Sequence, residues 1–247
     1  EEILWCIARL HDLSPEQAGF IDYKYEYIDR YSRLDFEKLS VLKSETELIE
    51  VLAGTPYGRI LAALPDKTGR ISYPVAEHSL HAYYFKALFA RIKKRYGSKK
   101  APQIEKTIGI EVDTLNVLLI YRLRILFGLP EEETREYLFD TAYRLKPDMM
   151  TSLLRAQTEQ AFIEALKATP YRFIADGANG TTFQTAVRAY ADRSARRVIH
   201  FSRHPVALIL AYLVLRDTEH DNLKTIIEGC RYRAPREQII PHLIGAE

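Results

Sequence analysis

The sequence is poor in cysteine and tryptophan, and neither sign of charge is in large excess. Its 247 residues include 2 cysteines and 1 tryptophan, and the formal net charge is +2. Two cysteines, Cys6 and Cys230, cannot build the dense disulfide framework of a small secreted domain, and they fit a reducing cytoplasm. The near balance of charge argues against general nucleic-acid binding. These absences favour an ordinary globular protein that needs no disulfide cross-links to fold.

Long hydrophobic runs are also missing. The longest, Val206–Leu215, is far shorter than the ~20 apolar residues that a membrane-spanning helix needs. We therefore expect neither a transmembrane segment nor a signal peptide. With 47% hydrophobic and 28% charged residues, the chain can bury a substantial core. The first residue is Glu rather than Met, which predicts a fragment or a trimmed form.

The stretch Glu111–Glu132 is the strongest helical signal in the chain. Apolar residues recur along it at steps of three and four, which places them on one helical face, and most of the remaining surface is apolar too. We therefore expect this helix to be packed on most sides. Gly128 suits the left-handed conformation just beyond a helix end, and Pro130 with its two following glutamates suits a new first turn. The residues on the main face are Val112, Leu115, Leu119, Leu123 and Leu126.

Two segments of the chain recur in the same order. Leu48–Tyr57 reads LIEVLAGTPY and Phe162–Tyr171 reads FIEALKATPY, while the central stretch has an echo at Glu219–Ile239. In each Thr-Pro pair the threonine would cap and the proline would open the next helix. In the echo Asn222 matches Asn116, so the sequence predicts a duplicated helical unit. The alternative is two unrelated helices that share a Thr-Pro turn.

No sustained period-two alternation occurs, so the fold class is predicted to be all-α. We expect a helix after Ser14-Pro15-Glu16, short helices on either side of Thr55-Pro56, and a long helix over Pro74–Tyr96 that Gly97 ends. A basic, solvated loop is predicted over Ser98–Pro102. The first of these helices would carry an aromatic stripe, which is typical of core: Phe20, Tyr23, Tyr27, Tyr31 and Leu34.

Further along, Asp176–Gly180 is predicted to be a flexible loop. It precedes a helix over Thr181–Arg203, and Pro205 breaks or restarts that helix. Val206–Leu215 is expected to be buried, and a separate helix is expected over Asn222–Cys230.

The sequence contains no recognisable motif for catalysis. Gly177–Thr182, GANGTT, lacks the lysine and the spacing of a phosphate loop. His78 and His81 beside Glu77, and likewise His200 and His204, have no evident third ligand and do not match His-Glu-x-x-His. We therefore predict no catalytic, cofactor-binding or metal-binding residues. A helical enzyme built on the first histidine pair would require bound metal.

Polar residues inside the central helix need partners. Asp113, Asn116 and Arg122 lie in an apolar context, where an unpaired polar group is costly. We interpret them as a polar clamp that joins helices within each repeat rather than as an acid–base site, because Asn222 retains the asparagine. A basic stripe is predicted on the Thr181–Arg203 helix, and it is either a solvated face or a dock for an acidic helix or a membrane surface. Its members are Arg193, Arg196, His200 and Arg203.

Together these segments resemble the C subunit family of A-type and V-type rotary ATPases, whose eukaryotic members are termed the d subunit. The resemblance runs from about Ser32 to the C-terminus and is strongest at EVDTLN and DNLKTII. It is carried by LIEVLAGTPYGRIL, EHSLHAYYFKALFARI, EVDTLNVLLIYRLRILFGLPEEE, FIEALKATPY and HPVALILAYLVLRDTEHDNLKTIIEGCRYRAPREQIIPHL.

The resemblance implies a non-catalytic, funnel-shaped rotor component made of three similar helical units. It would lie peripherally on the cytoplasmic face of the membrane and couple the central-stalk subunits to the membrane rotor ring for proton or sodium transport. This sequence departs from that pattern because it has two full units and at most the tail of a first, as in an N-terminally truncated form. Gly54 and Gly58 also become Ala168 and Arg172 in the second copy, so the two turns need not be identical.

We accordingly divide the sequence into a remnant with linker helices at residues 1–43, a repeat unit at 44–157 and a second at 158–247. The competing interpretation is an α-helical repeat adaptor that binds a protein partner in its concave face.

Overall fold

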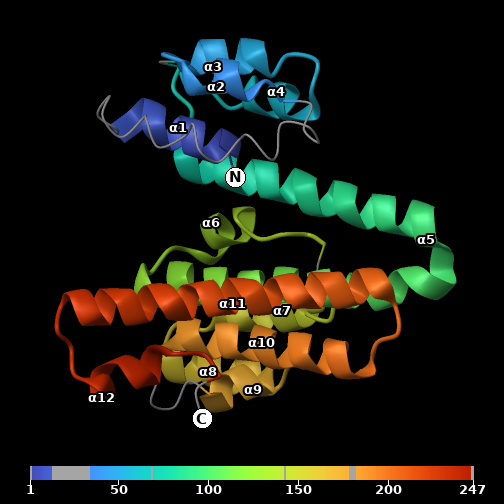
Figure 1. The fold of residues 1–247 in the computed structure, drawn as a ribbon, viewed down its shortest axis with the longest axis vertical. Coiled ribbons are helices and arrows are strands. Elements are labelled where there is room, and N and C mark those ends of the chain that lie inside the picture. The colour runs from blue at the N-terminus through green and yellow to red at the C-terminus, as the bar shows by residue number, and fades with distance from the viewer. Residues whose placement is uncertain (1, 13–33, 68, 142, 178–181, 246–247) are drawn as a thin grey trace. The chain divides into compact units, whose positions relative to one another are not determined.

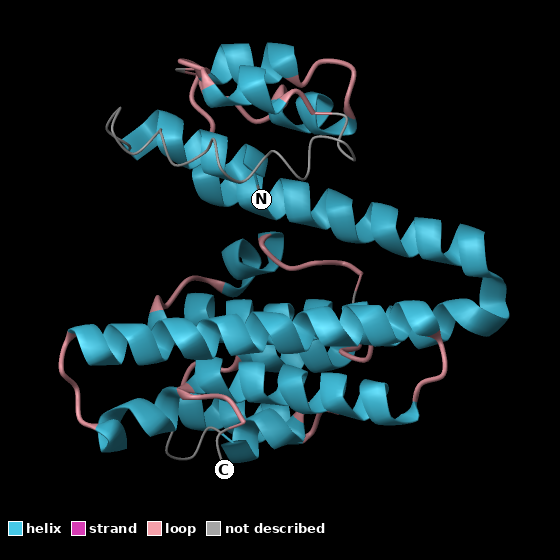
Figure 2. Cartoon of the chain, in the orientation of Figure 1, coloured by secondary structure: helices cyan, strands magenta, loops and turns pink. Residues whose placement is uncertain are grey.

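Helices make up the regular structure in the part of the chain that the computed structural model describes, residues 2–12, 34–67, 69–141, 143–177 and 182–245. Figure 2 shows these helices joined by loops, and no strand is drawn among the described residues. The all-α prediction is confirmed for them. The chain forms two compact units, Glu1–Tyr84 and Phe85–Glu247. The three-part division at residues 43 and 157 concerns sequence repeats and stays a prediction.

The described residues of the first unit form four short helices and the start of a long one. They are α1 (Glu2–Asp12), α2 (Phe36–Ser40), α3 (Glu45–Val51), α4 (Pro56–Leu61) and the opening of α5 (Tyr73–Ile120). Successive turns of α1 bury apolar side chains against α2 and α3. Arg9 is buried with them because its guanidinium donates to carbonyls at the end of α2, including Leu39 O at 3.1 Å and Leu42 O at 3.0 Å. The core includes Ile3, Leu4, Ile7, Leu39, Leu48, Leu52, Leu61 and Ile71.

Side-chain caps start both α3 and α4. The Ser44 hydroxyl accepts from Glu47 N at 3.2 Å, and the Thr55 hydroxyl accepts from Gly58 N at 3.1 Å. Glu47 departs from the capping-box pattern because its carboxylate accepts from Lys43 N rather than Ser44 N. Pro56 is the first residue of α4, as expected.

The matching turn in the second copy is built differently. Gly54 takes φ 83°, whereas its counterpart Ala168 is right-handed with φ −77°. The Thr169 hydroxyl accepts from Tyr171 N, and the next helix, α9 (Arg172–Gly177), begins after Pro170 rather than at it. The expected difference between the turns is thus confirmed, and the proline-led start is wrong for the second copy.

The long helix α5 changes direction at Gly97, which has φ 64° and ψ 177°. Glycine tolerates this left-handed backbone without the clash that a Cβ would cause. The predicted end at Gly97 is confirmed, but the predicted loop over Ser98–Pro102 is wrong, because helix resumes directly after the glycine. Pro102 lies near the start of this second segment, where a proline disturbs few intrahelical hydrogen bonds.

The central stretch does not continue as a regular α-helix. After Ile120 it widens into a π-helix, η3 (Tyr121–Leu126), and Gly128 then takes the expected positive φ of 67°. Because a π-turn contains an extra residue, the side chains beyond it leave the face that the three-and-four spacing assigns to them. Leu126 and Phe127 are therefore exposed, and the prediction that Leu126 lies on the buried face is wrong.

The rest of the second unit surrounds the end of α5 and η3. Its core gathers side chains from α7 (Pro147–Arg155), α8 (Glu159–Lys167), α9 and α10 (Phe183–Phe201), and Leu138 joins it from the segment after α6 (Glu131–Glu136). Thr158 caps α8 and Thr182 caps α10. The buried members of the core include Val117, Ile120, Leu153, Leu154, Phe162, Leu166, Tyr171 and Ile174.

Helix α11 (Pro205–Arg231) packs beside α10 and is continuous (Figure 1). It is followed by α12 (Arg236–Ile239) and η4 (Ile240–His242). The predicted break between Leu215 and Asn222 is therefore wrong. So is the predicted burial of Val206–Leu215, because only Ala207 and Ala211 of that run are fully buried against α10.

Three predictions fall wholly or partly outside the described residues. They are the helix that begins at Ser14, the aromatic side chains from Phe20 to Tyr31, and the Ala178–Gly180 part of the glycine-containing loop.

Candidate functional site

Asp113 is the polar centre of the second unit. Its side chain lies on α5 with an exposed fraction of 0% and accepts from the backbone N–H groups of Tyr143, Arg144 and Leu145 at 2.7, 2.6 and 2.9 Å. The hydroxyl of Tyr171 also donates to it. Burial raises the pKa of Tyr171, and the nearby Asp113 charge and this hydrogen bond raise it further. The carboxylate thus fixes the loop before α7 and the turn before α9 at once.

The side-chain amide of Asn116 forms two hydrogen bonds with the backbone of a single residue, one as donor and one as acceptor. Its amide donates to Phe139 O at 3.0 Å and accepts from Phe139 N at 2.8 Å. Asn222 repeats this arrangement with Ile244, at 2.9 Å in both directions. We call each pairing an amide clip. Both asparagines are thus hydrogen-bonded, but the predicted clamp between helices is wrong for them, because each ties a helix to a non-helical segment more than twenty residues later.

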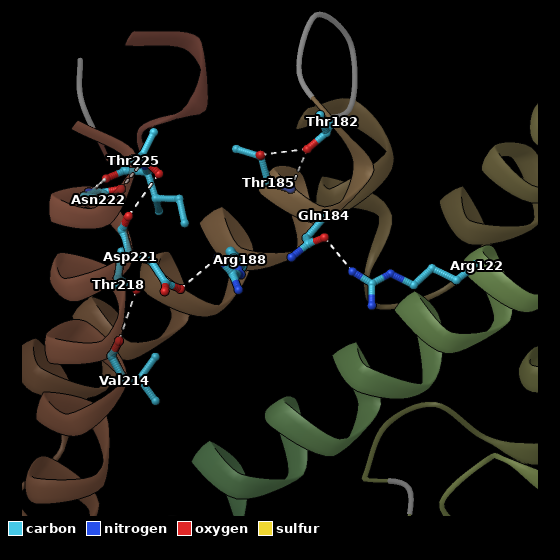
Figure 3. Close-up of polar contacts among 11 residues, drawn as sticks. Arg122, Thr182, Gln184, Thr185, Arg188, Val214, Thr218, Asp221, Asn222 and Thr225 are labelled. Atoms are coloured by element: carbon cyan, nitrogen blue, oxygen red, sulfur yellow. Dashed lines mark hydrogen bonds and ion pairs between the residues drawn. The ribbon is translucent and has the colours of Figure 1, made fainter. Parts of the chain in front are cut away.

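Arg122 is not part of either clip. Its guanidinium donates to Gln184 Oε1 at 2.5 Å, so it links η3 to α10, as Figure 3 shows. It therefore joins residues on the two sides of the predicted boundary at 157 rather than helices within one repeat. The counterpart of Arg122 in the echo, Glu228, is exposed. The same π-helical segment contributes Tyr121, whose ring stacks on Phe183 with centroids 4.1 Å apart.

A cavity of about 270 Å³ lies among the second half of α5, α10 and α11. Arg188 forms an ion pair with Asp221 at 2.8 Å, drawn in Figure 3, and is the only cation among the described residues that line the cavity. Glu111 is an exposed residue overall, but the surroundings of its carboxyl and the charge of Asp217 raise its pKa. The side chains that complete the lining are apolar or carry hydroxyl groups: Thr107, Ile110, Thr114, Ala191, Ser194, Ala195, Val198, Val214 and Thr218.

The predicted basic stripe lies on the outside of α10 and the residues after it. Arg193, Arg196, His200 and Arg203 are all exposed. Arg196 pairs with Asp192 of the preceding turn, and that hydrogen bond raises the pKa of the guanidinium. Exposure of all four side chains fits a solvated face and equally a docking surface, so both predictions stand.

Histidine does not form a metal site among the described residues. No group of three or more His, Cys, Asp or Glu side chains is suitably placed there to hold a metal ion. His204 instead packs edge-on against Tyr96, with ring centroids 5.4 Å apart. No helix in the described ranges combines the length and the hydrophobicity that crossing a bilayer requires.

Comparison with known proteins assigns the chain. The sequence profile described as ATP synthase (C/AC39) subunit matches residues 9–241. The chain belongs to the ATP synthase C/AC39 subunit family. The resemblance seen in the repeated segments is thereby confirmed, and the asparagines of the two amide clips lie on α5 and α11 within the matched range.

Relatives of this C/AC39 chain bear the name of the A-type ATP synthase C subunit. The protein from Methanosphaera stadtmanae is 24% identical over 206 residues, covering 80% of this chain and 53% of the relative. The one from Pyrococcus horikoshii is 27% identical over 210 residues, covering 82% and 55%. The one from Archaeoglobus fulgidus is 26% identical over 210 residues, covering 83% and 58%. The chain thus spans about half the length of the curated relatives it matches.

Sequence reasoning misses two features of this C/AC39 chain. The cavity brings together Glu111 and Asp217, which are more than a hundred residues apart in the chain. The bond from Tyr171 to Asp113 likewise joins distant positions. The buried setting of Asp113 is the available signal, because a carboxylate in an apolar helix must have partners even when the sequence does not identify them.

Proposed function

We propose that this C/AC39 chain is a non-catalytic part of the central rotor of an A- or V-type ATP synthase. In this role it couples the central-stalk subunits to the membrane ring that carries protons or sodium ions. It acts as a peripheral component at the cytoplasmic face of the membrane. The observation that carries the proposal is the family match over residues 9–241, and the names of the curated relatives agree with it.

The internal construction of the second unit supports a mechanical role. A part that transmits torque must resist relative movement of its helices under load. Asp113 and the two amide clips join distant segments by directional hydrogen bonds, and the surrounding core is closely packed. Such cross-links make local opening costly, because several buried polar groups would lose their partners together.

Reconstitution tests this role directly. An A-type complex depleted of its own C subunit would be supplied with this chain, and ATP hydrolysis and ATP-driven ion pumping would be measured in vesicles. We expect the chain to bind the stalk and to raise pumping per ATP hydrolysed. The matched control is the Asp113→Ala variant, which should couple less well. Absence of binding to both the stalk and the ring would refute the proposal.

We further propose that the helical units are arranged as part of a funnel. Small-angle scattering of the chain alone and of the chain bound to stalk subunits would test this arrangement. An envelope with an open wide end that the stalk fills is the expected result. A regular elongated solenoid would instead support the repeat-adaptor function.

The adaptor remains a second candidate because of one observation. Helix α11 presents apolar side chains to solvent over most of its length, including Ile209, Leu213 and Ile227. An apolar surface of this kind typically binds another protein. Binding to a partner outside the ATP synthase, with no affinity for stalk subunits, would favour the adaptor.

A further inference from the structure

The outer face of α11 has a regular pattern that the core of its unit does not use. Residues on this face follow one another at alternating steps of four and three: Ile209, Leu213, Arg216, His220, Leu223 and Ile227. We call these six residues the outer seam. The steps of four and three form the heptad pattern of a coiled-coil contact line.

The apolar residues of the outer seam are strongly exposed. Ile209, Leu213, Leu223 and Ile227 have exposed fractions of 59, 51, 51 and 64%. The opposite side of the same helix supplies the packing inside the unit, with Ala207 and Ala211 buried against α10. The helix thus has one face for its own unit and a second, apolar face that the unit does not cover.

The order of residues along the outer seam is the same in both directions. Read from either end, it gives isoleucine, leucine, a basic or imidazole side chain twice, leucine and isoleucine. Two copies aligned antiparallel would therefore place Ile209 opposite Ile227 and Leu213 opposite Leu223, with Arg216 opposite His220 at the centre. All four apolar positions would then be covered by apolar positions of the other copy.

Charge selects this alignment over the parallel one. In a parallel pair Arg216 would face Arg216 of the other copy, which brings like charges together. In the antiparallel pair each Arg216 instead faces His220, next to Glu219 of the other copy. Arg216 already forms an ion pair with Glu219 of its own helix, so both carboxylates would neutralise the central guanidinium groups.

We propose that the outer seam of α11 is a self-association surface, on which a second copy of this chain docks antiparallel to form a two-fold dimer. The inference goes beyond the proposed function and needs no other component of the ATP synthase. The seam covers about 27 Å of helix at 1.5 Å per residue, so the contact is near the small end of stable interfaces. A dissociation constant in the micromolar range is expected.

Sedimentation velocity of the full chain over a range of concentrations tests association. We expect conversion from monomer to dimer as concentration rises. Leu213→Lys should weaken the dimer at least tenfold, because the lysine would lie against leucine in the interface. The matched control is Ile199→Glu, which charges an exposed apolar side chain on α10 outside the outer seam and should leave the dimer unchanged. A chain that stays monomeric, or a dimer that Leu213→Lys does not affect, overturns the proposal.

A mixing experiment tests the antiparallel register and guards against misfolding. Leu213→Lys and Leu223→Glu should each be monomeric alone. When they are mixed, the antiparallel alignment brings the introduced lysine of one copy opposite the introduced glutamate of the other and should restore a mixed dimer. A parallel alignment would not bring these positions together. Failure of the mixture to associate, with both variants folded by circular dichroism, overturns the antiparallel arrangement.

Discussion

At the scale of single residues, buried polar side chains determine how distant segments meet. Asp113 accepts from three backbone N–H groups and a tyrosine hydroxyl while it is fully buried. Its partners depend on it, because loss of the carboxylate would leave buried donors without an acceptor. The sequence indicates that Asp113 must be bonded, but only the fold identifies its partners.

Replacing Asp113 by alanine should therefore destabilise the chain by about 3 kcal/mol. Urea unfolding followed by circular dichroism would measure the loss. Asp140→Ala is the control, since that aspartate is exposed, and it should change the unfolding free energy by less than about 0.5 kcal/mol. Equal stability of the two variants would contradict the role given to Asp113.

The two amide clips provide a second comparison at this scale. Asn116 is fully buried, whereas Asn222 is half-buried, although the hydrogen bonds are alike. Water can replace the partner that an exposed group loses, so burial sets the size of the effect. Asn116→Ala should cost about 2 to 3 kcal/mol and Asn222→Ala about 1 kcal/mol in unfolding free energy. Equal losses in urea unfolding would show that burial does not distinguish the clips.

The carboxyl of Glu111 should make stability depend on pH. Its pKa is raised in the folded state by burial and by Asp217 in the same cavity, where Arg188 and Asp221 pair with each other. The folded chain thus binds this proton more tightly than the unfolded chain, and stability falls as pH rises from the unfolded pKa of about 4.3 through the raised folded value.

Glu111→Gln cannot lose a proton, so its stability relative to the parent chain should increase across that pH window and then stay constant. Urea unfolding of both proteins at pH 4 and pH 7 would measure the difference. The Asp217→Asn variant provides the matched control, because it removes the neighbouring charge and leaves Glu111 in place. If the difference in unfolding free energy between Glu111→Gln and the parent is the same at both pH values, the raised pKa of Glu111 is contradicted.

At the scale of elements, the caps explain why helix starts follow from the sequence. Ser44, Thr55, Thr158 and Thr182 each accept a backbone N–H three residues later, a local interaction with a local sequence signal. The side of a helix that meets the core depends on the rest of the fold. Val206–Leu215 looks buried by composition alone, yet only its two alanines are fully buried, and Ile209, Tyr212 and Leu213 are exposed.

The turn between α3 and α4 depends on two glycines for different reasons. A Cβ on Gly58 would lie 2.3 Å from the carbonyl oxygen of Leu52, whereas a Cβ on Gly54 would meet nothing within 4 Å. Gly54→Ala therefore carries only the strain of a φ of 83°, about 1 kcal/mol, and Gly58→Ala should cost more, about 2 to 3 kcal/mol.

Fluorescence of Trp5 gives the readout for this pair of variants, because the single tryptophan packs against the core of the same unit. The decisive result is which of the two substitutions lowers the free energy of unfolding more. A Gly58→Ala variant no less stable than Gly54→Ala would show that the turn can open. The second copy, with Arg172 at the position of Gly58, begins its helix later in keeping with this restriction.

At the scale of the whole molecule, the fold class and the family follow from the sequence, because repeated helical segments occur in a fixed order. The two compact units cannot be predicted from the sequence, because the boundary between them, at Tyr84 and Phe85, lies within one helix. Periodicity cannot reveal such a boundary. The cavity is likewise not evident from the sequence, because part of its lining comes from α5 and the rest from α10 and α11, which lie much further along the chain.

The second unit should fold by itself. A fragment of residues 85–247 contains both amide clips, Asp113 and its own core. We expect it to be helical by circular dichroism and to unfold cooperatively in urea. The Asn116→Ala substitution should destabilise the fragment and the full chain by the same amount. A fragment without a cooperative transition would contradict the independence of this unit.

The π-helical turn at Tyr121–Leu126 has a consequence for how this chain tolerates insertion and deletion. The segment already holds one residue more than an α-helix of the same length would accommodate, so it can be shortened by one without moving either flank. We therefore expect related chains to differ in length by one residue most easily at this segment, because it already contains one extra residue.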